Sequence, residues 1–86
     1  MQDLSDAELV RRAKDGEHEA ITMLYDRHHT RIFRYVLARI YDTYLAQDLV
    51  GEVFLKMVTH LADYRATGVP FSAWLYRIAH NLVANW

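Results

Sequence analysis

Apolar side chains recur at three- and four-residue steps along most of the chain, the period of an α-helix with one buried face. The pattern predicts helices over residues 5–15, 17–41, 44–62 and 71–86, with a loop at 63–70. No segment alternates apolar and polar residues long enough to form a strand. We therefore expect an all-α fold, a compact bundle of about four helices. The second and third should be antiparallel, with the fourth crossing them.

Residues at the expected helix ends agree with these bounds. Ser5 and Glu8 have the spacing of a capping box, which opens a helix. Gly16 suits the left-handed turn that ends the first helix. Asp42 or Thr43 can cap the third helix.

The inward positions of each helix define the expected core. The first helix contributes Leu9, Val10 and Ala13. The second contributes Ile21, Leu24, Tyr25, His28, Ile32, Tyr35, Val36 and Ile40. The third contributes Leu45, Leu49, Val50, Val53, Phe54, Met57 and Leu61. The fourth contributes Phe71, Trp74, Leu75, Ile78, Ala79 and Leu82.

Composition places the chain among small globular domains. Its 86 residues suffice for one domain, and 52% apolar with 24% charged residues argues against disorder. The lack of cysteine excludes disulfides and thiolate metal sites and fits a reducing compartment. No apolar run approaches the roughly 20 residues of a membrane span, and the acidic start MQDLSDAEL is unlike a signal peptide. We expect a soluble cytoplasmic protein with no membrane association.

Metal and catalytic sites are not expected. His28 and His29 are adjacent and point about 100° apart on a helix, and the chain contains no H-x-x-x-H or E-x-x-H pair. The five histidines are therefore expected at the surface or its boundary. Asp48 and Glu52 lie one turn apart, but on an open helical side with no neighbouring nucleophile. We therefore expect no cofactor, no bound metal and no enzymatic activity.

The stretch from Asp63 to Asn81 combines aromatic, cationic and amide side chains. Its rings can stack on unpaired bases, each stack contributing roughly 1–3 kcal/mol, and its cations can meet phosphates. The alternative is that Phe71 and Trp74 are simply core residues, the commoner use of aromatic side chains. The net charge of −1 is low for a nucleic-acid binder, so any contact with DNA should need a larger partner.

Two segments carry a resemblance to a known family. FSAWLYRIAHNL, with DLVGEVFLKM upstream, resembles region 2 of bacterial sigma factors, most closely the extracytoplasmic-function (ECF) group. The similarity covers about Glu17 to Trp86 and is close from Ala46 onward. It implies a transcription initiation factor domain that binds core RNA polymerase and melts the promoter −10 element. A flipped non-template-strand base would be held by the loop at 63–70.

The resemblance also implies two sets of site residues. The DNA-binding set is Tyr64, Arg65, Phe71, Trp74, Arg77, His80 and Asn81. The polymerase-docking set, facing the β′ clamp helices, is Asp48, Leu49, Glu52, Val53 and Leu55. The chain departs from the family pattern at Gly51, where Gln is usual, and at His80, where Arg is frequent. The glycine implies a weaker contact with polymerase, and the histidine implies a weaker contact with phosphate.

Two further expectations follow from the resemblance. The region 4 domain that reads the −35 element is absent, so residues 1–86 should be a single excised region 2 domain. An anti-sigma factor is an expected partner. Two alternatives stay open: a sigma-like decoy that binds an anti-sigma factor without reading DNA, and a purely structural helical domain.

Overall fold

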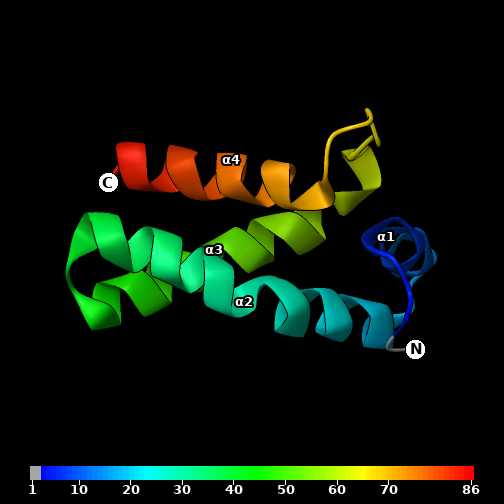
Figure 1. The fold of residues 1–86 in the computed structure, drawn as a ribbon, viewed down its shortest axis with the longest axis horizontal. Coiled ribbons are helices and arrows are strands. Elements are labelled where there is room, and N and C mark those ends of the chain that lie inside the picture. Colours follow the sequence, from blue (N-terminus) through cyan, green and yellow to red (C-terminus); the bar gives the residue numbers. More distant parts are fainter. Residues whose placement is uncertain (1–2) are drawn as a thin grey trace.

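The computed structural model describes residues 3–86 and is built entirely from helices and loops over that range (Figure 1). The α-helices are α1 (Asp6–Lys14), α2 (His18–Ile40), α3 (Thr43–His60) and α4 (Phe71–Ala84). A short 3₁₀ turn, η1 (Leu61–Asp63), follows α3. The expectation of a four-helix, all-α domain is confirmed. Met1 and Gln2, which the single-domain expectation includes, lie outside the described residues.

α2 and α3 run in opposite directions, and α4 lies beside α3 and runs back opposite to it (Figure 1). α1 is seen end-on, near the start of α2 and the end of η1. The helix that lies across the others is therefore α1, whereas we expected it to be the fourth helix.

The helix ends are fixed largely by the expected caps. The Ser5 hydroxyl accepts a hydrogen bond from the Glu8 backbone N–H at 3.1 Å and so caps α1. The Asp42 carboxylate accepts one from the Leu45 backbone N–H at 3.1 Å and caps α3. The Glu8 carboxylate accepts hydrogen bonds from Arg11, at 2.6 Å, and Arg12, at 3.2 Å. These two guanidinium groups, Arg11 first, lower the pKa of Glu8 to about 2.

One apolar core joins all four helices. Its members are Leu9, Val10, Ala13, Ala20, Leu24, Ile32, Val36, Ala46, Leu49, Val50, Val53, Phe54, Met57, Leu61, Phe71, Leu75 and Ala79. Ala20 and Ala46 were not in the predicted core because alanine contributes little to a hydrophobic period. Tyr25 was placed there wrongly, since 39% of its surface is exposed.

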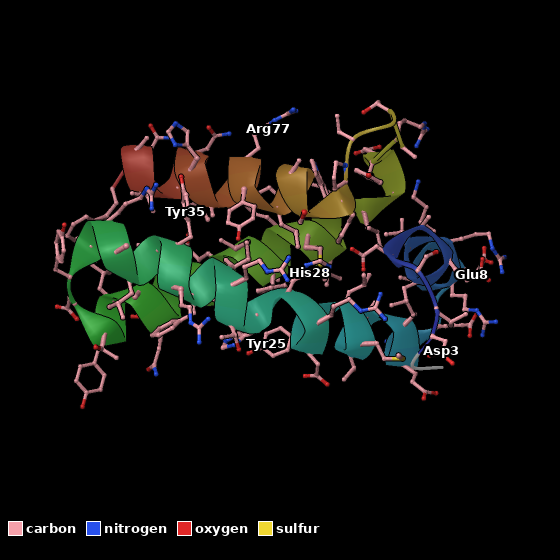
Figure 2. The ribbon with its side chains drawn as sticks, in the orientation of Figure 1. Asp3, Glu8, Tyr25, His28, Tyr35 and Arg77 are labelled. Atoms are coloured by element: carbon pink, nitrogen blue, oxygen red, sulfur yellow. The ribbon has the colours of Figure 1, made fainter. Side chains whose placement is uncertain are left out.

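His28 is buried, as its place in the apolar stripe of the second helix predicts, and this corrects the broader expectation that all five histidines lie at the surface or its boundary. Only 4% of it is exposed, and its side chain points into the bundle (Figure 2). Its Nε2 lies 2.9 Å from Asp6 Oδ2, and its ring packs edge-on against Phe71 with centroids 5.9 Å apart. The second oxygen of Asp6 accepts from Arg27 at 2.9 Å. This polar group fastens α1 to α2 beneath the start of α4.

Gly51 lies on the exposed side of α3, where an added Cβ would meet nothing within 4 Å. A mid-helix glycine costs about 1 kcal/mol relative to alanine. Gly51→Ala is therefore expected to raise the free energy of unfolding by about that amount, as measured by urea denaturation followed by circular dichroism. An unchanged or lower midpoint would show that backbone entropy at this position is not what limits α3.

Candidate nucleic-acid interface

The loop at 64–70 is tied down at its start. The Tyr64 backbone N–H donates to the Leu61 carbonyl at 3.1 Å, and the Tyr64 carbonyl accepts from Lys14 Nζ at 2.5 Å. The Arg65 guanidinium donates to the carbonyls of Ala62, at 3.0 Å, and Tyr64, at 3.2 Å. Gly68 supplies a left-handed turn, with φ of 87°. α1 and η1 thus both hold the loop against the start of α4.

Three rings pack together where this loop enters α4. Tyr64 lies 5.3 Å from Phe71 and 4.8 Å from Trp74, and Phe71 lies 5.4 Å from Trp74, between ring centroids. Phe71 is 5% exposed, whereas Tyr64 and Trp74 are half-buried. Of the DNA-binding set, Phe71 is therefore a support beneath the other two rings. Its ring offers no free face for a base.

A surface hollow of about 310 Å³ lies between the end of α3 and the outer side of α4. Its lining is Lys56, His60, Asp63, Tyr64, Trp74, Arg77, Ile78 and Asn81. The structure thus brings together Tyr64, Trp74, Arg77 and Asn81 from the DNA-binding set. Figure 2 shows Arg77 pointing away from the bundle. We call this cavity the α4 hollow.

Lys56 and His60 also line the α4 hollow but were not predicted as DNA contacts. They come from α3, and their place beside α4 depends on helix packing. Their four-residue spacing, at the end of α3 closest to the loop, is the signal in the sequence that could have identified them.

Arg65 and His80 do not line the α4 hollow. Arg65 is engaged by the backbone carbonyls of its own loop. His80 Nδ1 lies 3.3 Å from the Tyr35 hydroxyl of α2. The Tyr35 ring packs edge-on against Tyr76, with centroids 5.3 Å apart, so His80 belongs to the contact between α2 and α4.

A second hollow, of about 530 Å³, lies on the other side of the loop, against α1. Its lining is Ser5, Asp6, Ala7, Val10, Arg11, Lys14, Tyr64, Ala66, Val69, Pro70 and Phe71. We call it the α1 hollow. Tyr64 lines both hollows, so the ring forms part of the wall between them. The sequence analysis missed this cavity because α1 and the loop meet only in the folded chain.

The docking set divides into two groups. Asp48, Glu52 and Leu55 are exposed on α3, Leu55 by 63%. Leu49 and Val53 have 6% and 0% of their surface exposed, so their inclusion as direct contacts is corrected. Both side chains belong to the core, as their place in the helical period already indicated.

Five of the exposed residues of α3 form one stripe. Tyr44, Asp48, Gly51, Leu55 and Val58 follow at alternating steps of four and three residues, so they share one side of the helix. Tyr44 is 82% exposed and Val58 is 43% exposed. We call this set the α3 stripe. Its apolar members with an acidic group among them are typical of a surface that another protein covers.

No helix within residues 3–86 has the length and apolar character needed to cross a lipid bilayer. In the same part of the chain, no three His, Asp or Glu side chains are grouped so that they could hold a metal ion.

Comparison with known proteins identifies the family. Residues 24–86 match the sigma-70 region 2 family. The chain is 40% identical over 78 residues to the ECF RNA polymerase sigma factor BldN of Streptomyces coelicolor, covering 91% of this chain and 30% of that protein. It is 32% identical over 85 residues to the ECF RNA polymerase sigma-E factor of Escherichia coli, covering 99% of this chain and 44% of that protein. The chain thus spans less than half the length of these relatives.

Two solved structures share the fold. One is an engineered region 2 of sigmaE in complex with GTAAAA, with a TM-score of 0.87, 30% identity, and coverage of 99% of this chain and 87% of that one. The other is the RsbN–BldN complex, with a TM-score of 0.84, 39% identity, and coverage of 88% of this chain and 55% of that one. The chain therefore belongs to the sigma-70 region 2 family and is region 2 of an ECF sigma factor.

Proposed function

We propose that this domain, taken as a single region 2 unit, binds core RNA polymerase through the β′ clamp helices and reads the melted −10 element of a promoter in the cytoplasm. The observation that supports DNA reading is the α4 hollow, where ring, cation and amide groups meet at one accessible surface. The similarity to an engineered region 2 of sigmaE in complex with GTAAAA supports it further.

Each side chain of the α4 hollow has a distinct proposed role. Tyr64 and Trp74 are half-buried rings at 4.8 Å from one another, so they are rigid enough to stack on an unpaired base. The exposed Asn81 amide presents a donor and an acceptor together, which suits the hydrogen-bonding edge of a base. Arg77 and Lys56 supply positive charge for the phosphates on either side.

Charge explains why the polymerase is needed. The chain has 10 Lys and Arg against 11 Asp and Glu, so it lacks the general attraction to DNA that basic domains have. The cations of the α4 hollow provide only local attraction. Docking on polymerase would supply the missing binding free energy, by holding the melted strand next to this hollow at high effective concentration.

The test is a titration of the domain with single-stranded hexamers, GTAAAA and sequence variants, each carrying 2-aminopurine at one position. We expect quenching that depends on sequence, and a loss of affinity of about 5- to 100-fold in Trp74→Ala and Asn81→Ala, because each removes one base contact. Gln47→Ala removes an exposed amide of α3 that lies outside the α4 hollow, so it is the matched control and should bind as the original chain does. Sequence-independent binding would contradict the proposal.

The two hollows can be distinguished by filling one of them. Ala7 is exposed and lines the α1 hollow, so Ala7→Met occupies that space without changing charge. Unchanged hexamer affinity assigns the base to the α4 hollow, as we propose. If Ala7→Met abolishes quenching while Asn81→Ala does not, the base enters the α1 hollow and the roles given to Trp74 and Asn81 are wrong.

Salt dependence provides an independent prediction. If Arg77 neutralises one phosphate, Arg77→Gln should make the plot of log affinity against log salt less steep by about 0.7, the contribution of one contact to a single strand. Base preference should stay the same, because a phosphate contact carries no sequence information. An unchanged slope would show that Arg77 points away from the bound strand.

The alternative function, a protein-interaction module that does not read DNA, has one observation in its favour. BldN, 39% identical in its solved structure, is found there in complex with RsbN. An anti-sigma factor is accordingly a proposed partner of this domain in either function. Tight binding of such a protein combined with no base preference at any salt concentration would favour the alternative.

A further inference from the structure

The loop at 64–70 has few contacts of its own to keep it in place. Residues 65–70 are all exposed, so burial contributes little to holding them. Among the residues that the structure describes, no backbone group of 65–69 pairs with another backbone group. The far end of the loop is fixed by the start of α4, so its path depends on how its first residue, Tyr64, is held.

The contact that reaches Tyr64 from another helix comes from Lys14, the last residue of α1. Its Nζ donates to the Tyr64 carbonyl at 2.5 Å, across 50 residues of sequence. The same Nζ lies 5.8 Å from the centroid of the Tyr64 ring, within the range of a cation–π contact. Figure 1 shows α1 and the loop at the same end of the bundle. One ammonium group therefore contacts both the backbone and the ring of Tyr64.

The other two cations of α1 are used within their own segment. Arg11 pairs with Glu8 at 2.6 Å and with Asp15 at 3.4 Å. Arg12 pairs with Glu8 at 3.2 Å. Lys14, by contrast, forms no ion pair with a carboxylate of residues 3–86. Its charge is thus directed at the loop, where a charge-assisted hydrogen bond is stronger than one between neutral groups.

The Tyr64 carbonyl is the point at which the chain changes course. Tyr64 follows the 3₁₀ turn with φ of −66° and ψ of 135°, an extended conformation. Because the peptide unit is planar, fixing this carbonyl also fixes the direction in which the loop continues. Arg65 donates to the same carbonyl at 3.2 Å, but from within the loop. Lys14 is therefore the group that relates the loop to α1.

The orientation of Tyr64 matters because its ring forms part of the wall between the α1 hollow and the α4 hollow. The ring packs against Phe71 and Trp74 at 5.3 Å and 4.8 Å. A loop that moved away from α1 would carry this ring with it and change the shape of the α4 hollow.

We propose that Lys14 is a positioning residue for DNA reading: by holding Tyr64 from α1, it sets the orientation in which the ring meets an unpaired base. Lys14 lines the α1 hollow and not the α4 hollow, so it acts through Tyr64. It also precedes residues 24–86, which match the family, so its role comes from the contacts of this chain. The DNA part of the proposal rests on the proposed function, whereas the bracing of the loop rests on the contacts alone.

The first measurement is made on the free chain, so that it does not depend on DNA. In the ¹⁵N-labelled chain, Lys14→Met should lower the backbone order parameters of residues 65–69, toward the value of about 0.6 that marks a flexible backbone. Methionine keeps most of the length of the side chain and loses its donor and charge. Lys14→Arg keeps both and should restore the order. Arg34→Met removes an exposed cation of α2 and is the matched control, with no change expected in the loop.

The second measurement is the hexamer titration, repeated at several salt concentrations. Lys14→Met should weaken GTAAAA binding by about 2- to 10-fold, because the loop must then be ordered on binding. Lys14→Arg should recover most of the affinity. The plot of log affinity against log salt should be equally steep for Lys14→Met and Arg34→Met, because neither residue neutralises a phosphate in this arrangement. Circular dichroism and the urea midpoint of Lys14→Met should stay close to those of the original chain, since Lys14 is exposed.

Three results would overturn the proposal. One is unchanged order in the loop of Lys14→Met, and another is unchanged hexamer affinity despite a loosened loop. The third is a salt plot less steep by about 0.7 in Lys14→Met alone, which would make Lys14 a direct phosphate contact. If the original chain binds no hexamer, the proposed function fails, and the order parameters alone then decide whether Lys14 braces the loop.

Discussion

Replacing both Asp48 and Glu52 with arginine should reduce the affinity of this domain for a β′ clamp-helix fragment by about a hundredfold or more. Both side chains are exposed on α3, so the change reverses the charge of the proposed docking surface without entering the core. Like charges brought together in an interface cost several kcal/mol, and they also slow the association. Calorimetric titration against the clamp helices of the E. coli polymerase would measure the loss.

The control is a double reversal of the same charge elsewhere. Asp3 and Glu19 are exposed and lie outside α3, so Asp3→Arg with Glu19→Arg changes the net charge equally and should leave clamp affinity within about threefold, the scale of a long-range effect. Circular dichroism should show unchanged helicity in both variants. If the clamp affinity survives reversal at Asp48 and Glu52, the exposed side of α3 that carries these two residues is not the docking surface.

His28→Ala should lower the free energy of unfolding by about 2–4 kcal/mol, as expected for removing a large buried side chain. The histidine is almost fully buried, contacts Asp6 at 2.9 Å and packs against Phe71. The change leaves a cavity and removes one of the two partners of the Asp6 carboxylate. For a domain of this size the loss is a large share of the total stability.

Urea denaturation would measure this effect, with His18→Ala as the control. His18 is the same residue type at an exposed position in the first turn of α2, so its removal should cost about 0.5 kcal/mol or less. Equal midpoints for the two variants would show that the contact between His28 and Asp6 does not hold α1 in place. A large loss in His28→Ala should also reduce hexamer binding, because α1 supports the loop through Lys14.

The helices could be predicted because their period and caps are local properties. The inward place of His28 followed from the same period, but its partner could not be predicted, because Asp6 comes from another helix, 22 residues earlier. A histidine within an apolar stripe does not reveal which carboxylate will satisfy it. The docking set shows a different error. The helical period placed Leu49 and Val53 inward, the family motif placed them at the interface, and the structure agrees with the period.

The α4 hollow was predictable as far as it is built from one helix. Trp74, Arg77 and Asn81 follow at steps of three and four and so share one side of α4, but the helical period assigned Trp74 to the core, and only the family resemblance grouped the three residues. Arg65 and His80 belong to the same predicted DNA-binding set as these three residues. Their side chains are taken up by the carbonyls of the loop and by Tyr35 of α2, contacts that only the folded chain creates.

The match to the family begins at residue 24, beyond the whole of α1 and the first turn of α2. A fragment cut at that point would lose Asp6 and Lys14, and with them both tethers described for α1. It would uncover His28 and leave the Tyr64 carbonyl with the hydrogen bond from Arg65 alone. The family model thus matches less of the chain than the part whose contacts hold the fold together, and a minimal fragment for binding studies must keep the first helix.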